Sequence, residues 1–300
     1  MSLFEKEIIE RNEGLKKVLA NKMSDDWPVF SKRFVAFFDI AGFKATSKNL
    51  HYSYSLLSAF NEIVEKAEKH YMNDKTQYLY MLAVSDSIVI FSRDDSPTSF
   101  CCFCNAIGYL FNRSLLFKRM MNAAISYGEI SVDKKNMVFC GGPYNRAYLI
   151  QENMDYYGIL CDSTINEYLS KNEGCVVDGF SMYANHFLDV DFFWKAKEFE
   201  TQKIGCYKNY FWYDESLYGD ALYTEIKWGN EKIGLCSDDG FVSGTYHEII
   251  TDVIETYAKG EPDKIKMRLN NTMDVLEFML AKRRFNNEQK FERYKLEKTK

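Results

Sequence analysis

The sequence predicts an α+β fold with a ferredoxin-like core, in which an antiparallel-rich sheet is covered by helices. Apolar residues make up 46% of the 300 residues, and there are only 4 Pro and 16 Gly, so the composition favours a large hydrophobic core over disorder or a fibrous repeat. Short apolar runs alternate with longer segments of helical periodicity in the first two thirds of the chain. Their order is βαββαβ, which is typical of the ferredoxin-like arrangement.

The core elements follow from local patterns. The first strand is an apolar run that reaches Asp39 and then enters a tight turn at Gly42. The second and third strands are joined by a turn that contains Asp86. In order, we expect a strand at 34–40, a helix at 54–71, strands at 78–84 and 88–91, a helix at 99–118, a strand at 122–130 and a hairpin turn at 133–136.

Less regular segments flank this core. We expect an N-terminal helix and linker at 1–30, a main domain at 31–178 and a C-terminal α/β extension at 179–300, which either stands apart or packs on the core. Within these flanks the expected elements are a leading helix at 3–22, an aromatic strand at 207–213 and helices at 246–257 and 264–282.

Charge and cysteine content exclude several functional classes. A net charge of −5 argues against bulk electrostatic binding to nucleic acid or to an anionic membrane. Apolar runs fall short of the roughly 18 residues of a membrane helix, and the charged N-terminus does not resemble a signal peptide. We therefore expect a cytoplasmic protein whose 8 cysteines are reduced. Cys101 and Cys104 form a C-x-x-C pair without a second ligand pair, which indicates buried packing.

Two aspartates interrupt the apolar strands. Asp39 and Asp86 end strands that the βαββαβ order places side by side, and neighbouring strands are about 4.8 Å apart. Two bare carboxylates about 4 Å apart would repel by roughly 4 kcal/mol at an effective dielectric constant near 20. A cation is therefore expected between them, and their oxygens favour Mg²⁺ or Mn²⁺, which points to nucleotidyl chemistry. The alternative is that each aspartate is only a turn residue.

Four motifs in order resemble those of class III nucleotide cyclases. Residues 38–43 resemble the D-I-x-G-F signature, 85–87 the second metal-aspartate turn, 126–130 the G-E strand and 141–149 the G-x-x-x-N helix. The variants D-I-A-G-F-K and N-R-A-Y-L-I-Q-E look closest to the pyrimidine cyclases of Pycsar antiphage systems. This resemblance implies a class III cyclase core that converts UTP or CTP to cyclic UMP or cyclic CMP during phage infection, and a separate effector that the product activates.

The resemblance also implies roles for particular residues. Asp39, Asp86 and the backbone carbonyl of Ile40 would hold two Mn²⁺ or Mg²⁺ ions, which activate the ribose 3′-hydroxyl and neutralise the leaving pyrophosphate. A homodimer would carry its sites at the interface. Backbone N–H groups after the first strand would face the phosphates, and the residues concerned are Ala41, Gly42, Phe43 and Lys44.

This sequence differs from purine cyclases at the positions that recognise the base and at the position that stabilises the transition state. Where adenylate cyclases have polar base-reading residues, this chain has Leu82 and Val138, so a purine edge would find no partner. Because side chains alternate between the two faces of a strand, Tyr80 lies on the same side as Leu82, where a smaller base is expected. The catalytic helix carries Asn145, but the usual arginine position is Leu149. The expected replacements are Arg146 and then Lys44.

Other interpretations stay open. A catalytically silent cyclase-like module could bind a nucleotide as a sensor, and Leu149 favours that alternative. A purine cyclase with unusual base recognition is a second alternative, and a polymerase-like palm enzyme is disfavoured by the acidic chain. The residues do not decide between uracil and cytosine. Uridylate cyclase is favoured because the resembling family contains more of that type.

Overall fold

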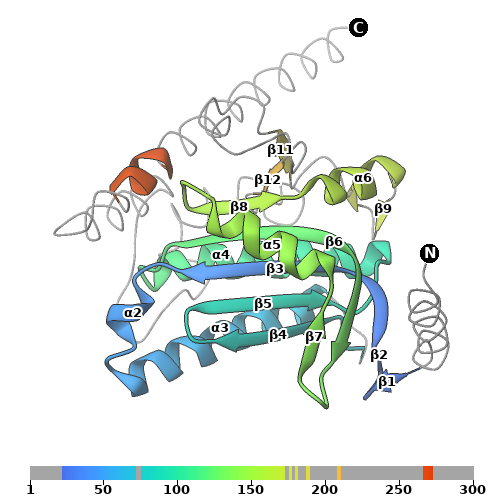
Figure 1. The fold of residues 1–300 in the computed structure, drawn as a ribbon, viewed down its shortest axis with the longest axis horizontal. Coiled ribbons are helices and arrows are strands. Elements are labelled where there is room, and N and C mark those ends of the chain that lie inside the picture. The colour runs from blue at the N-terminus through green and yellow to red at the C-terminus, as the bar shows by residue number, and fades with distance from the viewer. Residues whose placement is uncertain are drawn as a thin grey trace, which may run out of the picture.

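The computed structural model describes residues 22–71, 76–172, 176–177, 180–181, 187–189, 208–210 and 266–272 (Figure 1). Its strands are β1 Met23–Ser24, β2 Trp27–Pro28, β3 Phe30–Ile40, β4 Leu79–Val84, β5 Ser87–Ser92, β6 Met121–Asp133, β7 Val138–Cys140, β8 Gly158–Cys161, β9 Val176–Val177, β10 Phe180–Ser181, β11 Phe187–Asp189 and β12 Lys208–Tyr210. Its helices are α2 Phe43–Thr46, α3 Leu50–Tyr71, α4 Pro97–Leu116, α5 Gly142–Glu152 and α6 Ser163–Lys171, and residues 266–272 are also helical.

The main sheet confirms the predicted α+β class and the βαββαβ order. Along the sheet the strands run β11-β12-β8-β6-β3-β5-β4, and β7 pairs with β6. All neighbours in this sheet are antiparallel except β6 and β8, which are parallel. The longest ladder joins β3 to β6, from Phe30 opposite Ser131 to Ile40 opposite Met121. The strands β3 and β5, which border the two aspartate turns, are neighbours in this order.

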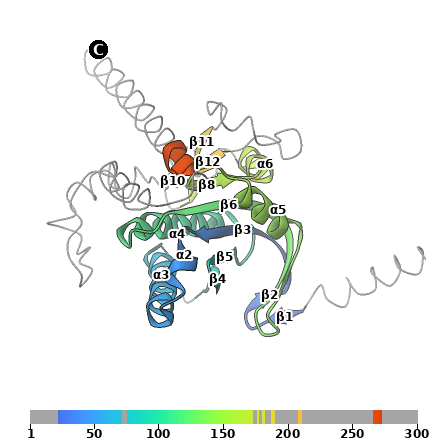
Figure 2. The ribbon, with the colours of Figure 1, turned by 60° about the vertical axis from the view of Figure 1, so that its left-hand side comes forward.

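Helices cover the two faces of the sheet unequally, as Figure 2 shows. Alternate β3 side chains such as Phe34 and Phe38 pack into the larger core, to which α3 and α4 contribute. The intervening side chains Val35 and Phe37 face the other way, in a smaller cluster that includes Ala147 of α5. Asp39 has the odd-numbered position of Val35 and Phe37, so its side chain lies on the α5 face of the sheet.

Several predicted boundaries differ from the observed ones. The first core helix begins at Leu50, before the predicted 54, and the last core strand continues to Asp133 because it pairs with β7. The division into three segments stays a prediction, although β11 and β12 extend the main sheet beyond β8. Most of the predicted leading helix and all of the helix expected at 246–257 lie outside the described residues, and the helix expected at 264–282 is described only over 266–272.

Cys101 and Cys104 lie on α4, and burial raises the pKa of the Cys104 thiol. Among the helices that the structure describes, none has the length and hydropathy required to cross a membrane.

A tight backbone approach fixes the start of α5. A Cβ atom on Gly141 would lie 2.8 Å from the carbonyl oxygen of Glu129 and 2.9 Å from the Cα of Ile130, and the residue has a φ of 158°. A Cβ on Gly142 would approach only the end of a flexible side chain, Arg146, at 3.1 Å. We expect Gly141→Ala to lower the free energy of unfolding by about 1–2 kcal/mol in urea titrations, whereas Gly142→Ala stays near the parent value. Equal stabilities of the two variants would contradict this interpretation.

Candidate active site

Asp39 occupies the next-to-last position of the central strand. In the ladders of β3 it lies opposite Ser87 on β5 and opposite Asn122 on β6. Directly opposed residues of antiparallel strands point to the same face of a sheet, so these three side chains share the face that carries α5. The carboxylate is half-buried at the end of an apolar strand.

Asp86 lies in the two-residue connection between β4 and β5. The turn brings it beside the end of β3, because the backbone carbonyl of Asp86 accepts a hydrogen bond from the N–H of Ile40 at 2.9 Å. Ser85, the first turn residue, has a φ of 57°, a left-handed conformation that glycine adopts without strain. The two aspartates that the sequence analysis paired are thus brought together by the β3–β5 register.

The electrostatics of Asp39 reflect this arrangement. Burial, and then the negative charge of Asp86, raise the pKa of Asp39 to about 6. The positive charge of Arg268, in the C-terminal helical segment, acts in the opposite direction. Sequence reasoning did not single out Arg268, because no local pattern links residue 268 to residue 39.

The raised pKa predicts how the metal-free protein responds to pH. An unfolded aspartate ionises near pH 3.9, so between about pH 4 and 6 the folded state binds more protons than the unfolded state. The free energy of unfolding should therefore fall as pH rises through this window. In a chelating buffer at pH 7, Asp39→Asn should be more stable than the parent by about 1–2 kcal/mol, since solvent screening removes part of the full effect. Urea titrations at several pH values test this, and a constant difference between the two proteins from pH 4 to 7 would contradict it.

The donor set around Asp39 fits a hard divalent cation. The expected ligands are the carboxylates of Asp39 and Asp86 and the backbone carbonyl of Ile40, and all of them are oxygen ligands. Magnesium commonly binds through one or two carboxylates together with substrate phosphates and water. Within the described part of the chain, there is no group of three or more His, Cys, Asp or Glu side chains that could hold a metal.

The residues at 41–44, which follow β3, differ in whether their N–H groups and side chains are available to a ligand. The N–H of Ala41 donates to the carbonyl of Met120 at 2.9 Å, so this group is already engaged. Gly42 precedes α2 with a φ of 71°, a left-handed conformation suited to glycine. Phe43 is buried in the larger core, so only its backbone can face a ligand, and Lys44 is exposed. The first N–H groups of a helix have no intrahelical acceptor, which leaves those of α2 as donors.

The α5 residues divide between exposed and engaged side chains. Asn145 and Leu149 are exposed. Arg146 forms an ion pair with Asp162, with 2.7 Å between Nε and Oδ2, and its Nη2 donates to the carbonyl of Tyr127 at 2.9 Å. Burial raises the pKa of Asp162, but hydrogen bonds from Ser126, the Thr164 N–H and Arg146 together hold it below its usual range. Arg146 thus ties α5 to β6 and α6.

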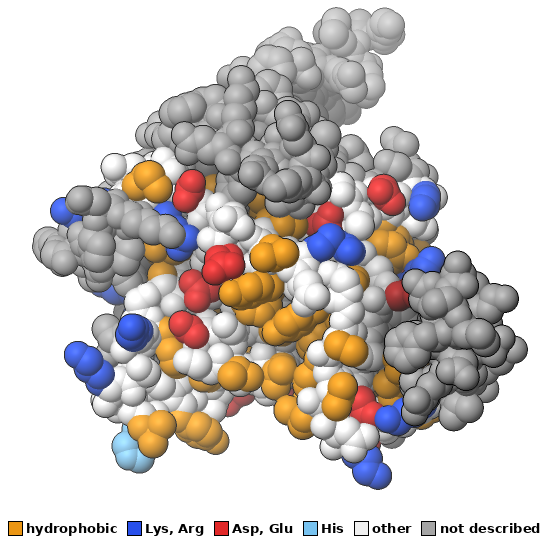
Figure 3. Space-filling model, in the orientation of Figure 1, with side chains coloured by type: hydrophobic (Ala, Val, Ile, Leu, Met, Phe, Trp, Pro, Cys, Tyr) orange, Lys and Arg blue, Asp and Glu red, His pale blue; other side chains and the backbone are white. Residues whose placement is uncertain are grey.

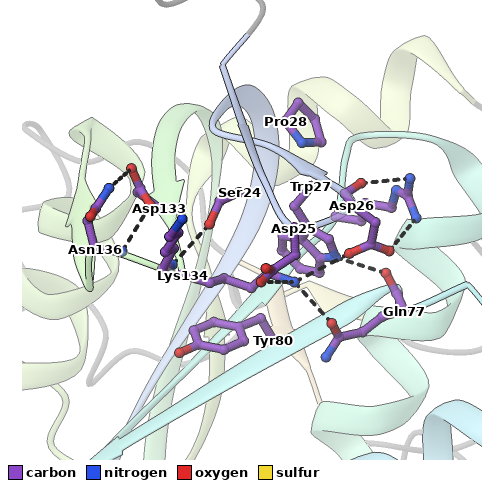
Figure 4. A network of polar contacts seen from close by, with 12 residues as sticks. Ser24, Asp25, Asp26, Trp27, Pro28, Gln77, Tyr80, Asp133, Lys134 and Asn136 are labelled. Carbon is purple, nitrogen blue, oxygen red and sulfur yellow. Dashed lines mark hydrogen bonds and ion pairs between the residues drawn. The ribbon is translucent and has the colours of Figure 1, made fainter.

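Tyr80 and Leu82 lie on β4 at different distances from the aspartates. Leu82 pairs with Val89 on β5, two positions from Ser87, whereas Tyr80 pairs with Phe91, four positions away. Tyr80 stacks on Phe139, with 5.8 Å between ring centroids. Figure 4 shows it beside Lys134, whose Nζ lies 5.9 Å from the Tyr80 ring and 3.5 Å from an oxygen of Asp26. Of the two, Leu82 is nearer to Asp39.

Exposed hydrophobic side chains lie on the α5 face of the sheet (Figure 3). In Figure 3, hydrophobic side chains cover the middle of this face, and acidic side chains gather beside them. Large exposed hydrophobic residues include Val84, which is in the same row as Ser87 and Asp39, and Tyr148 and Leu149 on α5. Exposed apolar side chains gathered on one face are typical of an interaction site.

Comparisons with known proteins give structural neighbours only. No protein-family model and no curated protein matches this sequence. The chain is similar to the monomeric guanylyl cyclase domain of the RhoGC fusion protein from the aquatic fungus Blastocladiella emersonii, with 13% identity, a TM-score of 0.39 and coverage of 53% of this chain and 89% of that one. A rhodopsin-guanylyl cyclase catalytic core with converted specificity, in complex with ATPαS, matches with 10% identity, a TM-score of 0.45 and coverage of 62% and 98%.

A third neighbour is an adenylate/guanylate cyclase/hydrolase from Silicibacter pomeroyi, with 10% identity, a TM-score of 0.36 and coverage of 61% of this chain and 98% of that one. At these low identities, the argument for function depends on the residues of the site itself.

Proposed function

We propose that this protein is a nucleotide cyclase that converts a pyrimidine nucleoside triphosphate, UTP ahead of CTP, to the 3′,5′-cyclic monophosphate and pyrophosphate. The observation that carries the proposal is the position of Asp39, at the end of β3, beside Asp86, in the turn before the neighbouring strand β5, within a chain that has four cyclase-like motifs in order. By the same resemblance, the product is a second messenger of antiphage defence that activates a separate effector.

The residues of the site support a division of labour. Asp39, Asp86 and the Ile40 carbonyl would hold Mg²⁺ or Mn²⁺, which supplies acidification of the 3′-hydroxyl and neutralisation of phosphate charge. The N–H groups at the start of α2 and the exposed Lys44 are donors for phosphate oxygens. Leu82 offers the base an apolar surface, which has no hydrogen-bond partner for the polar edge of a purine. Asn145 is exposed on α5, where it is available to a ligand or a second chain.

We further propose a homodimer that forms through the α5 face. Support comes from the exposed hydrophobic residues of that face and from the exposure of Asn145, which can then serve the site of the other chain. Sedimentation of the purified protein tests this, since a monomer at all concentrations contradicts it.

A second candidate is a catalytically silent module that binds a nucleotide as a sensor. The specific observation in its favour is that Leu149 stands at the usual arginine position while Arg146 is engaged with Asp162. The presence of both aspartates favours the active enzyme.

One experiment separates these functions. The purified chain is incubated with each of the four nucleoside triphosphates and Mn²⁺, and the products are resolved by chromatography and identified by mass. Cyclic UMP or cyclic CMP is the expected result. Cyclic AMP or cyclic GMP would indicate a purine cyclase, and nucleotide binding without turnover would indicate the silent module.

A further inference from the structure

The C-terminal helical segment, residues 266–272, is attached to the beginning of β8. The N–H of Tyr157 donates to Oγ1 of Thr272 at 2.8 Å, and Nδ2 of Asn271 donates to the carbonyl of Asp155 at 2.9 Å. Leu269 is 1% exposed and belongs to the larger core. The segment, red in Figures 1 and 2, therefore has a defined position against the sheet.

This position places the segment beside the row of residues that contains Asp39. Asp39 lies opposite Asn122 on β6, and Asn122 lies opposite Gly158 on β8, so the three residues form one row across the sheet. Two strand spacings separate Gly158 from Asp39, or about 10 Å. Arg268 lies one helical turn before Thr272, whose hydroxyl donates to the Arg268 carbonyl at 2.7 Å.

Arg268 carries an unused buried donor. Its Nε is inaccessible to solvent and has no hydrogen-bond partner, and in the same row the Oδ1 of Asn122 is also buried without one. Among the described residues, Arg268 forms no ion pair within 4.0 Å, although its charge acts on Asp39. A buried donor without a partner is unfavourable, and a bound ligand is one way in which the missing interaction is supplied.

We propose that Arg268 binds phosphate oxygens of the nucleotide at this site, as a cation that the C-terminal segment supplies within the same chain. The proposal rests on the proposed function, because it takes the ligand to be a nucleoside triphosphate. Two carboxylates and a triphosphate carry more negative charge than two divalent ions neutralise, so a further cation stabilises the bound state. Guanidinium presents a planar fork of donors that matches phosphate oxygens. Arg268 would thereby supply a positive charge that Leu149 does not.

The test measures binding, with inorganic pyrophosphate as the probe. Calorimetric titration of the full chain in Mg²⁺ compares the parent with Arg268→Gln and Arg268→Lys. Loss of a charge-assisted hydrogen bond predicts that Arg268→Gln weakens pyrophosphate binding roughly 10- to 100-fold, and that the lysine variant is intermediate because it keeps the charge without the fork. Lys266→Gln is the matched control: it removes an exposed charge from the other side of the same helix and should stay within about twofold of the parent.

Each outcome bears on the assignment. Equal pyrophosphate affinity of the parent and Arg268→Gln, or no binding by the parent, would overturn it and leave Arg268 as a counter-charge for Asp39. Thermal unfolding shows whether Arg268→Gln folds. If it does not, Arg268→Lys is the variant that decides. Parent-like pyrophosphate affinity of Arg268→Lys would overturn the need for a guanidinium fork. Failure of the proposed function is seen separately, as the absence of any cyclic product in the nucleotide panel while pyrophosphate binding still depends on Arg268.

Discussion

Asp39→Asn and Asp86→Asn should each reduce nucleotide cyclisation by about a thousandfold or more. Each substitution removes a charged oxygen ligand from a donor set with only two carboxylates, and metal ions contribute several kcal/mol of transition-state stabilisation, at about 1.4 kcal/mol per tenfold in rate. Initial rates with UTP and CTP in Mn²⁺ measure the effect. Because Asp39→Asn is expected to be more stable than the parent in the absence of metal, its loss of activity cannot be attributed to unfolding.

The matched control is Glu167→Gln. Glu167 is an exposed carboxylate on α6, outside the site, so its neutralisation should leave cyclisation unchanged. Turnover within about tenfold of the parent in either aspartate variant would contradict the metal-binding role, since the loss of a metal ligand should exceed such a small effect.

Arg146→Met should lower the free energy of unfolding by about 2–3 kcal/mol. Asp162 has a side chain only 1% exposed, and it would lose the Nε donor at 2.7 Å. Removal of one partner from a buried pair leaves a charge that water does not solvate, with a typical effect of about 3–5 kcal/mol. We expect less here because Ser126 and the Thr164 N–H still donate to the Asp162 carboxylate and Arg146 is partly exposed. Urea titration at pH 7 measures the loss.

The double variant Arg146→Met with Asp162→Asn separates the pair from its surroundings. If the ion pair is the cause, the double variant should be more stable than Arg146→Met alone, because no unpaired charge remains buried. The same proteins test the catalytic expectation for Arg146. Parent-like stability combined with lost turnover would show that Arg146 acts on the substrate, whereas parent-like turnover of the folded variant would remove it from the catalytic residues.

Local patterns were sufficient for the central elements. The apolar run before Asp39 predicted β3, and the turn at Asp86 between two apolar runs predicted β4 and β5. Helix ends were predicted less well. The start of α3 at Leu50 precedes the periodic residues, because the hydrophobic first-turn residues Leu50 and Tyr52 are exposed and do not belong to the buried face of the helix. The hairpin partner β7 is short and exposed, so its pairing and the length of β6 could not be read from alternation.

The sequence alone determined which residue types the site offers: two acidic side chains that interrupt apolar segments, glycine where the turn into α2 has a positive φ, and the apolar residues Leu82 and Val138 where the resemblance implies base recognition. These features are local, because each depends on a strand, a turn or a few neighbouring positions. The tertiary structure alone decided the partners of the cations. It paired Arg146 with Asp162 and brought Arg268 to the row of Asp39, since attraction between charges depends on distance in space and not along the chain.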